Sequence, residues 1–372
     1  MQNPSVLLSG PGQVAIKDLA LPEITDANDV IIRIAYTGVC GSDVHFWRSG
    51  GIRACVSADA PLVMGHEASG TIHAVGPSAT HLFAPGDRVA IEPGVSCRTC
   101  QPCKAGRYNL CPRMRFAADP ASGTHGTLSR FFKSAADFCY RLPDGVGLRD
   151  GVLIEPLAVA VHAVRLAGIL GEPGKKVVVF GAGTVGLFCA AVAREFGAAA
   201  VVSVDLLPAK LQVARRLVGE DTCRTWVPDG SLSPVDNAEK LKKECGLSSA
   251  VVDGGDDGEG GAHVVLEATG AEVSVQTSIY TLRPGGVYVQ VGMGKRNIDF
   301  PIAEIGEREI TVKGCFRYGP GDFAIAMDLV ARGKISLDGL VTGEFAFDKA
   351  WEAWESTGRG EGIKNVISGP GA

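Results

Sequence analysis

The chain has 372 residues, of which 46% are hydrophobic and 21% charged, as is common in globular proteins that mix α and β structure. This length exceeds what one core usually holds and predicts two domains. The net charge of −5 excludes a basic, phosphate-tracking surface, so we expect no nucleic-acid partner. No apolar run is long enough to span a membrane and no secretory signal is visible, which predicts a cytoplasmic protein with no membrane partner.

The region from residue 1 to residue 156 alternates short β-type runs with turns rich in glycine and proline. The runs expected to form strands are residues 29–36, 70–75 and 88–91. Short strands separated by such turns are typical of a mostly antiparallel, barrel-like unit. The sequence therefore predicts a mostly β domain in this region.

The region from residue 157 to residue 296 alternates strands with helices. The expected elements are strands at 175–180, 199–205, 263–267 and 287–291, and a helix at 184–196. This α/β alternation predicts a doubly wound parallel sheet. The acidic, glycine-rich residues 252–261 favour a mobile surface loop, because their spacing does not match a calcium-binding loop. Residues 297–372 are mixed again and include an expected helix at 322–332.

A glycine-rich turn, Gly181-Ala182-Gly183-Thr184-Val185-Gly186, joins the expected strand at 175–180 to the helix that follows. In this context the first glycine permits a tight turn, the second lets a pyrophosphate approach, and the third allows close packing of helix on strand. Asp205 ends the next strand, where a carboxylate can accept hydrogen bonds from the adenosine ribose and would repel a 2′-phosphate. The pattern predicts NAD rather than NADP as cofactor. The alternative is a glycine-rich turn that binds nothing.

Four of the eleven cysteines lie in one short segment, with the spacing C-x2-C-x2-C-x7-C. They are Cys97, Cys100, Cys103 and Cys111. Four thiolates this close can surround Zn²⁺ as a tetrahedron with no open position, which predicts a structural zinc site. Buried or redox thiols rarely show such regular spacing. A nucleic-acid-binding zinc knuckle would need a histidine and more basic and aromatic neighbours than Lys104, Arg107 and Tyr108.

A second candidate metal site is dispersed along the chain and comprises Cys40, the Gly65-His66-Glu67 run and Glu155. Thiolate, imidazole and carboxylate with water in the remaining position would make an open, catalytic zinc site. Taken alone, Cys40 could be a core thiol, His66 a buried histidine with a partner, and Glu155 an acid at a helix N-terminus. Their occurrence beside the cysteine segment and the glycine motif favours the catalytic interpretation.

Together, these motifs resemble those of the zinc-containing medium-chain alcohol dehydrogenases, specifically the polyol branch. The resemblance covers essentially the whole chain and includes Gly41-Ser42-Asp43-Val44-His45, Gly86-Asp87-Arg88-Val89, Glu155-Pro156-Leu157 and Gly314-Cys315-Phe316-Arg317-Tyr318. It implies an α/β fold in which a central Rossmann domain, residues 157–296, interrupts a mostly β, GroES-like catalytic domain made of residues 1–156 and 297–372. It also implies an active site in the cleft and a homo-tetramer.

The resemblance further implies roles for single residues. Cys40, His66 and Glu67 match the ligands of the catalytic zinc, and Glu155 matches a carboxylate that binds this metal directly or holds its water. Ser42 and His45 match proton-relay positions. The implied cofactor contacts are Gly181, Gly183, Val185, Gly186, Asp205, Lys210, Val291, Gly292, Met293, Phe316 and Arg317. The implied substrate contacts are Phe46, Glu155, Arg317 and Tyr318. Phe46 stands where animal sorbitol dehydrogenases have a tyrosine, which puts one hydroxyl contact in doubt.

The implied reaction is the oxidation of a small sugar alcohol to a ketose with NAD, by a protein with one catalytic and one structural zinc per chain. The continuation Gly319-Pro320-Gly321-Asp322-Phe323 is similar to that of fungal xylitol dehydrogenases, so xylitol and its product D-xylulose are expected first. Sorbitol, oxidised to D-fructose, and L-arabinitol are the alternatives. A non-catalytic NAD-binding sensor or structural protein is the alternative from another class. It would be expected to have a damaged metal triad.

Overall fold

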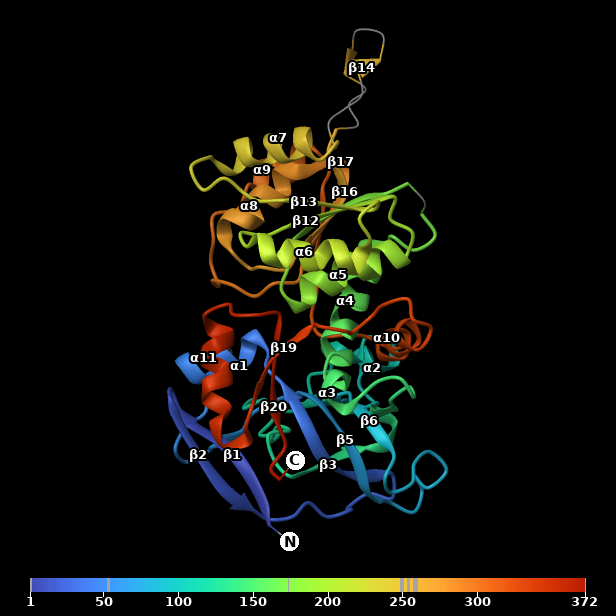
Figure 1. The fold of residues 1–372 in the computed structure, drawn as a ribbon, viewed down its shortest axis with the longest axis vertical. Helices are drawn as coiled ribbons and strands as arrows, with labels where there is room; N and C mark the ends of the chain where they lie inside the picture. The colour runs from blue at the N-terminus through green and yellow to red at the C-terminus, as the bar shows by residue number, and fades with distance from the viewer. Residues whose placement is uncertain are drawn as a thin grey trace. The chain divides into compact units, whose positions relative to one another are not determined.

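The computed structural model describes residues 2–51, 54–172, 174–247, 251–252, 255–256 and 260–371. The chain forms two units, shown in Figure 1. Unit 1 comprises Met1–Pro156, Gly319–Gly333 and Leu337–Ala372, and unit 2 comprises Leu157–Tyr318 and Lys334–Ser336. The sequence places the second boundary at residue 296, whereas the structure continues unit 2 to Tyr318 because a further strand, β18 (Thr311–Gly314), joins its sheet.

A seven-stranded sheet in unit 1 contains strands from both parts of the chain. Its order is β10-β6-β5-β3-β20-β19, and β9 also pairs with β3. The strands are β3 (Asp29–Gly38), β5 (Glu67–Val75), β6 (Arg88–Ile91), β9 (Phe131–Ala135), β10 (Cys139–Arg141), β19 (Val341–Phe345) and β20 (Lys364–Ser368). All pairs are antiparallel except β19 with β20. Because β3 pairs with β20, residues more than 300 positions apart share one sheet, which confirms the predicted fold class of this unit.

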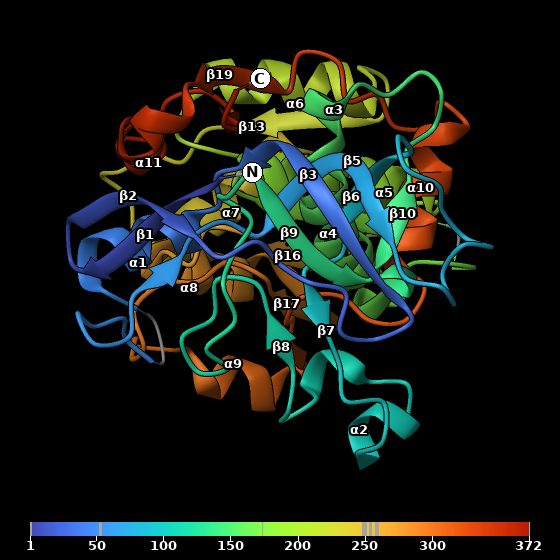
Figure 2. The same cartoon turned by 90° about the horizontal axis from the view of Figure 1, so that it is seen from below.

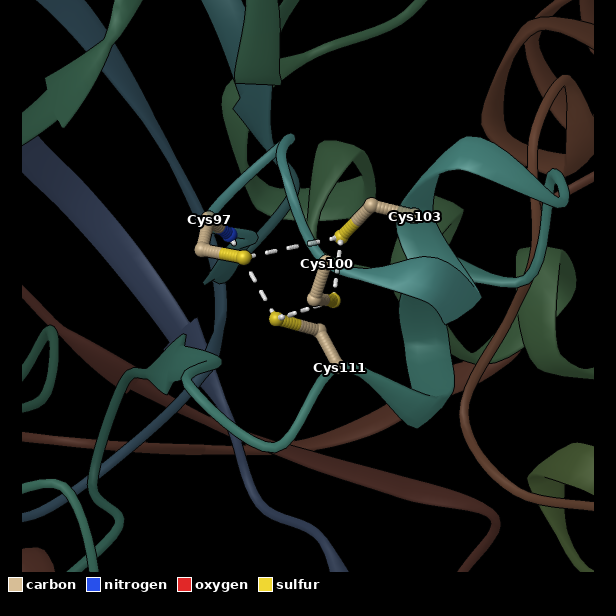
Figure 3. Close-up of side chains that lie close together, drawn as sticks. All are labelled: Cys97, Cys100, Cys103 and Cys111. Atoms are coloured by element: carbon tan, nitrogen blue, oxygen red, sulfur yellow. Dashed lines mark hydrogen bonds between the residues drawn. The ribbon is translucent and has the colours of Figure 1, made fainter.

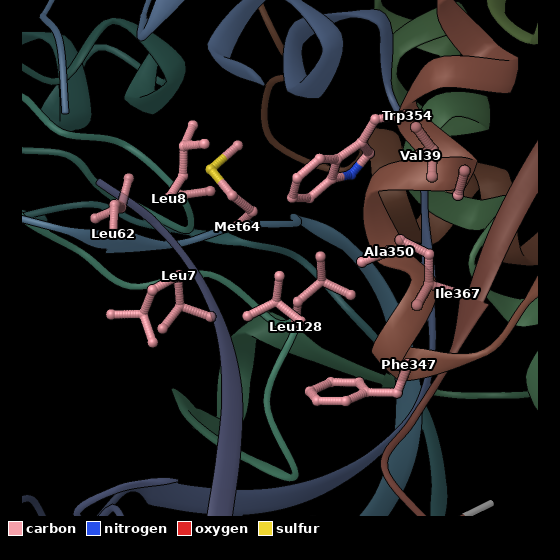
Figure 4. Close-up of a cluster of buried hydrophobic side chains, with 14 of the residues drawn as sticks. Leu7, Leu8, Val39, Leu62, Met64, Leu128, Phe347, Ala350, Trp354 and Ile367 are labelled. Atoms are coloured by element: carbon pink, nitrogen blue, oxygen red, sulfur yellow. The ribbon is translucent and has the colours of Figure 1, made fainter. Parts of the chain in front are cut away.

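A hydrophobic cluster holds two helices of unit 1 in place, as Figure 4 shows. Trp354, on α11 (Ala350–Gly358), is fully buried and packs with residues of β1 (Asn3–Gly10) and β4 (Leu62–Val63). Helix α1 (Gly41–Ser49) packs on α11, and the rings of Trp47 and Trp354 lie 6.5 Å apart. Burial of such large apolar surfaces is the main force that fixes α1.

Unit 2 is built on a six-stranded parallel sheet with the order β13-β12-β11-β16-β17-β18. The other strands are β11 (Lys176–Phe180), β12 (Ala200–Val204), β13 (Cys223–Trp226), β16 (Ala262–Glu267) and β17 (Leu282–Gln290). Helices α5 (Thr184–Glu195) and α6 (Pro208–Val218) lie on one face, and α7 (Pro234–Glu244) and α8 (Glu272–Thr281) lie on the other (Figure 1). The strand order reverses between β11 and β16, which is the point where such sheets bind ligands. The predicted doubly wound sheet is confirmed.

Several element bounds differ from the expected ones. β5 begins at Glu67 rather than at residue 70, and β17 begins at Leu282 rather than at residue 287. Helix α10 (Asp322–Ala331) agrees with the expected helix to within one residue. In the acidic segment 252–261, the structure describes the backbone of two short paired strands, β14 (Val251–Val252) and β15 (Gly255–Asp256). Residues 253–254 and 257–259 lie outside the described residues, and so does the prediction of a mobile loop. Within the part of the chain that is described, no helix is long and apolar enough to cross a bilayer.

Candidate active site

The dispersed residues Cys40, His66 and Glu67 come together in unit 1. One potential ligand atom from each lies within 4.8 Å of the others. Glu67 pairs with Gly38 at the end of β3, so Cys40, two residues later, faces the start of β5. Gly65 has φ +88 and a side chain there would meet Thr37, so the turn before His66 requires glycine. The trio supplies the mixed thiolate, imidazole and carboxylate donors of a zinc site that keeps an open position.

Each buried residue of this trio lies beside a buried side chain of opposite charge. Asp43, 1% exposed, accepts a hydrogen bond from Cys40 N at 2.9 Å, and its other oxygen lies 3.7 Å from His66 Nδ1. Burial is the largest single effect and disfavours the charged imidazole, but the Asp43 carboxylate, Cys40 and the charge of Glu155 together outweigh it and raise the pKa of His66 to about 10. A metal ion would therefore compete with a proton at His66.

Lys364 is the partner of Glu67. It comes from β20, is 3% exposed, and places Nζ 2.5 Å from Glu67 Oε2 while donating to Val39 O at 3.0 Å. Burial, the largest single effect, lowers the pKa of this ammonium, but the charges of Glu67, Cys40 and Glu155 and the hydrogen bond to Glu67 together reverse it, and the net shift is upward. Without a bound metal, removing the ammonium would leave the Glu67 carboxylate buried without a counter-charge.

The other residues implied for this site occupy two helices. Glu155 lies at the start of α4 (Ile154–Ala167), is buried, and raises the pKa of both His66 and Lys364 through its charge. It is not a member of the trio whose ligand atoms lie within 4.8 Å. On α1, Ser42 is half-buried and His45 is exposed one turn later. Phe46 packs against the hydrophobic cluster of Trp354.

The four cysteines of the predicted structural site point toward one another (Figure 3). The sulfurs of Cys97 and Cys103 lie 4.0 Å apart, those of Cys100 and Cys103 3.4 Å, and those of Cys100 and Cys111 3.7 Å. Four sulfurs bound to zinc at about 2.3 Å would form a tetrahedron with edges of about 3.8 Å. The separations fit such a centre and are far too long for disulfides, and all eleven cysteines are free.

The cysteine segment is a local structure in unit 1. It runs from β7 (Gly94–Val95) through α2 (Gln101–Lys104) to β8 (Arg115–Phe116), which pairs with β7 (Figure 2). The Thr99 N–H donates to Cys97 and is the largest cause that lowers the pKa of this thiol to about 5. Arg113 donates to Thr99 Oγ1 at 3.0 Å and, through its charge, also favours the thiolate of Cys97. These contacts favour the thiolate form of Cys97, the form that binds a metal.

The glycine motif joins β11 to α5 at the point where the strand order reverses. Gly181 has φ +94, and a side chain at Gly186 would collide with the Gly181 carbonyl, so both positions require glycine. Gly183 is the N-cap of α5 and has no atom within 4 Å of where a Cβ would stand, which leaves room for a ligand. Asp205 accepts hydrogen bonds from Ala182 N at 2.7 Å and Leu207 N at 2.9 Å. These contacts fix its carboxylate beside the glycine turn. Val185 and Lys210 are half-buried on α5 and α6.

Glu267, which the motif analysis did not single out, organises the ends of β16 and β17. This fully buried carboxylate accepts hydrogen bonds from Gly270 N and Gln290 Nε2, both at 2.8 Å, and from Thr269. Its carbonyl accepts the N–H groups of residues 291 and 292. It thus holds the segment that contains Val291, Gly292 and Met293. The signal for Glu267 that was available in the sequence is a carboxylate at the end of an otherwise apolar parallel strand.

The run after β18 contains Phe316, Arg317 and Tyr318. Arg317 has φ +57, a left-handed conformation uncommon for a residue with a side chain, and its guanidinium lies 4.7 Å from the Phe316 ring centre. Tyr318 is 2% exposed. Backbone strain of this kind is often found at binding sites.

Comparisons with known proteins agree with this geometry. The model of the alcohol dehydrogenase GroES-like domain matches residues 26–144, and that of the zinc-binding dehydrogenase family matches residues 184–332. "Probable D-xylulose reductase A" of Neosartorya fischeri is 48% identical over 368 residues, which cover 99% of this chain and 97% of that protein.

Two solved structures extend the comparison. L-idonate 5-dehydrogenase from Escherichia coli is 27% identical, with a TM-score of 0.83 over 99% of this chain and 98% of that one. A zinc-binding dehydrogenase from Sinorhizobium meliloti, solved with NADP bound, is 26% identical, with a TM-score of 0.81 over 99% of both chains. The family matches, the near full-length relatives and the two assembled clusters lead to one assignment: the chain belongs to the zinc-containing medium-chain alcohol dehydrogenases, in their polyol branch.

Proposed function

We propose that the protein oxidises xylitol to D-xylulose with NAD as the hydride acceptor. The observation that carries this proposal is the intact trio of Cys40, His66 and Glu67 with its buried partners Asp43 and Lys364. A binding protein without catalysis would have no reason to retain such a costly arrangement of buried charges. The relatives named as D-xylulose reductases support the choice of substrate.

The trio would hold a catalytic zinc ion, and the four-cysteine segment would hold a structural one. When bound, zinc polarises the substrate hydroxyl and lowers its pKa. Ser42 and the exposed His45, three residues apart on α1, are suited to pass the hydroxyl proton to solvent. The charge that Glu155 exerts on His66 and Lys364 supports a carboxylate near the metal, as a direct ligand or through water.

The cofactor proposal rests on the glycine turn and Asp205. The N–H groups at the start of α5 suit a pyrophosphate, and the fixed Asp205 carboxylate suits an unmodified adenosine ribose. Because a carboxylate would repel a 2′-phosphate, NAD is preferred to NADP. In this proposal Val291, Gly292 and Met293 lie beside the nicotinamide, and Arg317 and Tyr318 bind the polyol hydroxyls. Donors arranged as in a guanidinium and a phenol suit a ligand with several hydroxyls.

The direct test is a panel of xylitol, sorbitol and L-arabinitol with NAD and with NADP. We expect the highest kcat/KM for xylitol with NAD, and a raised KM for NAD in Asp205→Ala. Metal analysis of the purified protein should find two zinc ions per chain. A protein that binds NADH but oxidises none of the polyols would contradict the proposed reaction, and equal use of NADP would contradict the role of Asp205. The implied homo-tetramer can be checked by light scattering of the same sample.

A further inference from the structure

A buried carboxylate of unit 1 that lies outside the metal trio, that of Glu92, accepts hydrogen bonds from two tyrosines. Glu92 directly follows β6 and is 1% exposed. Tyr108 donates its hydroxyl hydrogen to one carboxylate oxygen, and Tyr140 donates to the other at 2.9 Å. Each oxygen therefore accepts a hydrogen bond from one tyrosine hydroxyl. A buried carboxylate with two such donors is held in one orientation.

The two tyrosines connect separate parts of the chain. Tyr108 lies inside the cysteine segment, between Cys103 and Cys111, and its hydroxyl also lies 3.3 Å from Gly319 O. Gly319 N in turn donates to Asp322 Oδ2 at 2.6 Å, which closes the turn before α10. Tyr140, on β10, stacks on Phe323 with ring centres 5.1 Å apart. The network thus ties the cysteine segment and the sheet to residues 319–323.

The turn that this network holds follows directly after two residues of the proposed substrate site. Its first residue, Gly319, follows directly after Arg317 and Tyr318, the pair proposed to bind the polyol. We infer that Glu92, with Tyr108 and Tyr140, is a positioning residue for polyol binding. It anchors the turn at residues 319–322 to the cysteine segment. This inference rests on the proposed function, because it assumes that residues 317 and 318 contact the substrate.

The charge on Glu92 makes the network sensitive to pH. Burial raises the pKa of Glu92 to about 7, although both phenols oppose this shift. The acidic groups that face it are Asp137, which pairs with Arg98, and Asp322 on α10, and both act in the same direction as burial. Above this pKa both oxygens accept hydrogen bonds. Below it one oxygen carries a hydrogen and is a poorer acceptor, so one tyrosine hydrogen bond is weakened and the turn is held less firmly.

The test compares Tyr108→Phe and Glu92→Gln with the matched control Tyr36→Phe. Tyr36 also donates to a carboxylate of unit 1, that of Glu344 at 3.4 Å, but on the exposed side. Removing one charge-assisted hydrogen bond should raise the KM for xylitol about tenfold in both network variants. The KM for NAD, the zinc content and the kinetics with a simple secondary alcohol should change little. Tyr36→Phe should match the unmodified protein in every measurement.

A pH profile separates positioning from general structural support. In the unmodified protein the KM for xylitol should rise as the pH falls through about 7, and in Glu92→Gln this step should be absent. Equal losses with xylitol and the simple alcohol, or an unchanged KM for xylitol in a folded, zinc-loaded Tyr108→Phe, would overturn the inference. If Tyr108→Phe fails to fold, Tyr140→Phe provides the same comparison. An unmodified protein that oxidises no polyol would instead refute the proposed function.

Discussion

The two clusters of potential zinc ligands are assembled in different ways. The cysteine segment takes all four ligands from residues 97–111, and three of the four thiols are partly exposed. The trio takes Cys40 from the N-terminus of α1 and the buried residues His66 and Glu67 from the start of β5. A local cluster can form a closed, structural centre, whereas a cluster built from separate elements can keep one side open for a substrate.

The clusters also differ in how their charge is stabilised. In the cysteine segment, a backbone N–H and the side chains of Thr99 and Arg113 favour the thiolate of Cys97 near solvent. In the trio, the Lys364 ammonium neutralises Glu67 in the interior, with both side chains at most 3% exposed. Removing the partner of a buried charge costs much free energy, whereas an exposed charge is screened by water. Mutations should therefore affect turnover and stability differently in the two clusters.

The largest expected effect is on turnover in His66→Ala. Loss of this ligand should lower kcat/KM for xylitol by about 10³-fold or more, because a catalytic metal supplies several kcal/mol to the transition state. NADH binding and the circular dichroism spectrum should remain near those of the unmodified protein, since His66 lies in unit 1 and the glycine motif in unit 2. An active His66→Ala protein depleted of its catalytic zinc would show that the trio is not the catalytic site.

The next effect is on stability, in Lys364→Met. In protein stripped of zinc by a chelator, removing the ammonium leaves Glu67 buried without a counter-charge, so we expect the free energy of unfolding to fall by about 3–5 kcal/mol. Denaturant titration measures this difference. The control is Lys349→Met, whose ammonium lies 3.6 Å from Glu352 but is more than half exposed, and which should cost at most about 1 kcal/mol. Similar losses of unfolding free energy in both variants would mean that an unpaired charge at buried Glu67 costs no more than one at an exposed pair.

The smallest of the three effects is expected for Cys100→Ser. A weaker metal centre in the cysteine segment should lower Tm by about 5 °C and reduce the zinc content toward one ion per chain. The trio should still support turnover in the fraction that remains folded, because no ligand is shared between the clusters. Complete loss of kcat with both zinc ions retained would argue against a structural role for this segment.

The sequence alone determined the features whose chemistry is local. The four cysteines lie within 15 positions, and the glycine turn is preceded by an apolar strand and followed by a helix, so neighbouring residues carry the whole pattern. Cys40 and His66 were candidate ligands by their donor chemistry and matched the family's zinc ligands by resemblance, and the pairing of β3 with β5 explains how they meet. The end of unit 2 was placed too early because β18 is a short edge strand with mostly exposed residues, which leaves no apolar run to detect.

Only the tertiary structure revealed the partners of the buried charges. Lys364 lies 297 positions from Glu67, in a strand where a lysine would ordinarily face solvent. Glu92 follows a short strand and Glu267 ends an apolar one, but their sequence neighbours do not identify the groups that bind them. Their donors come from residues that the fold brings together, such as Tyr108 and Tyr140 for Glu92. Burial and long-range hydrogen bonds depend on the packing of whole elements, and the amino-acid pattern of one segment does not contain that information.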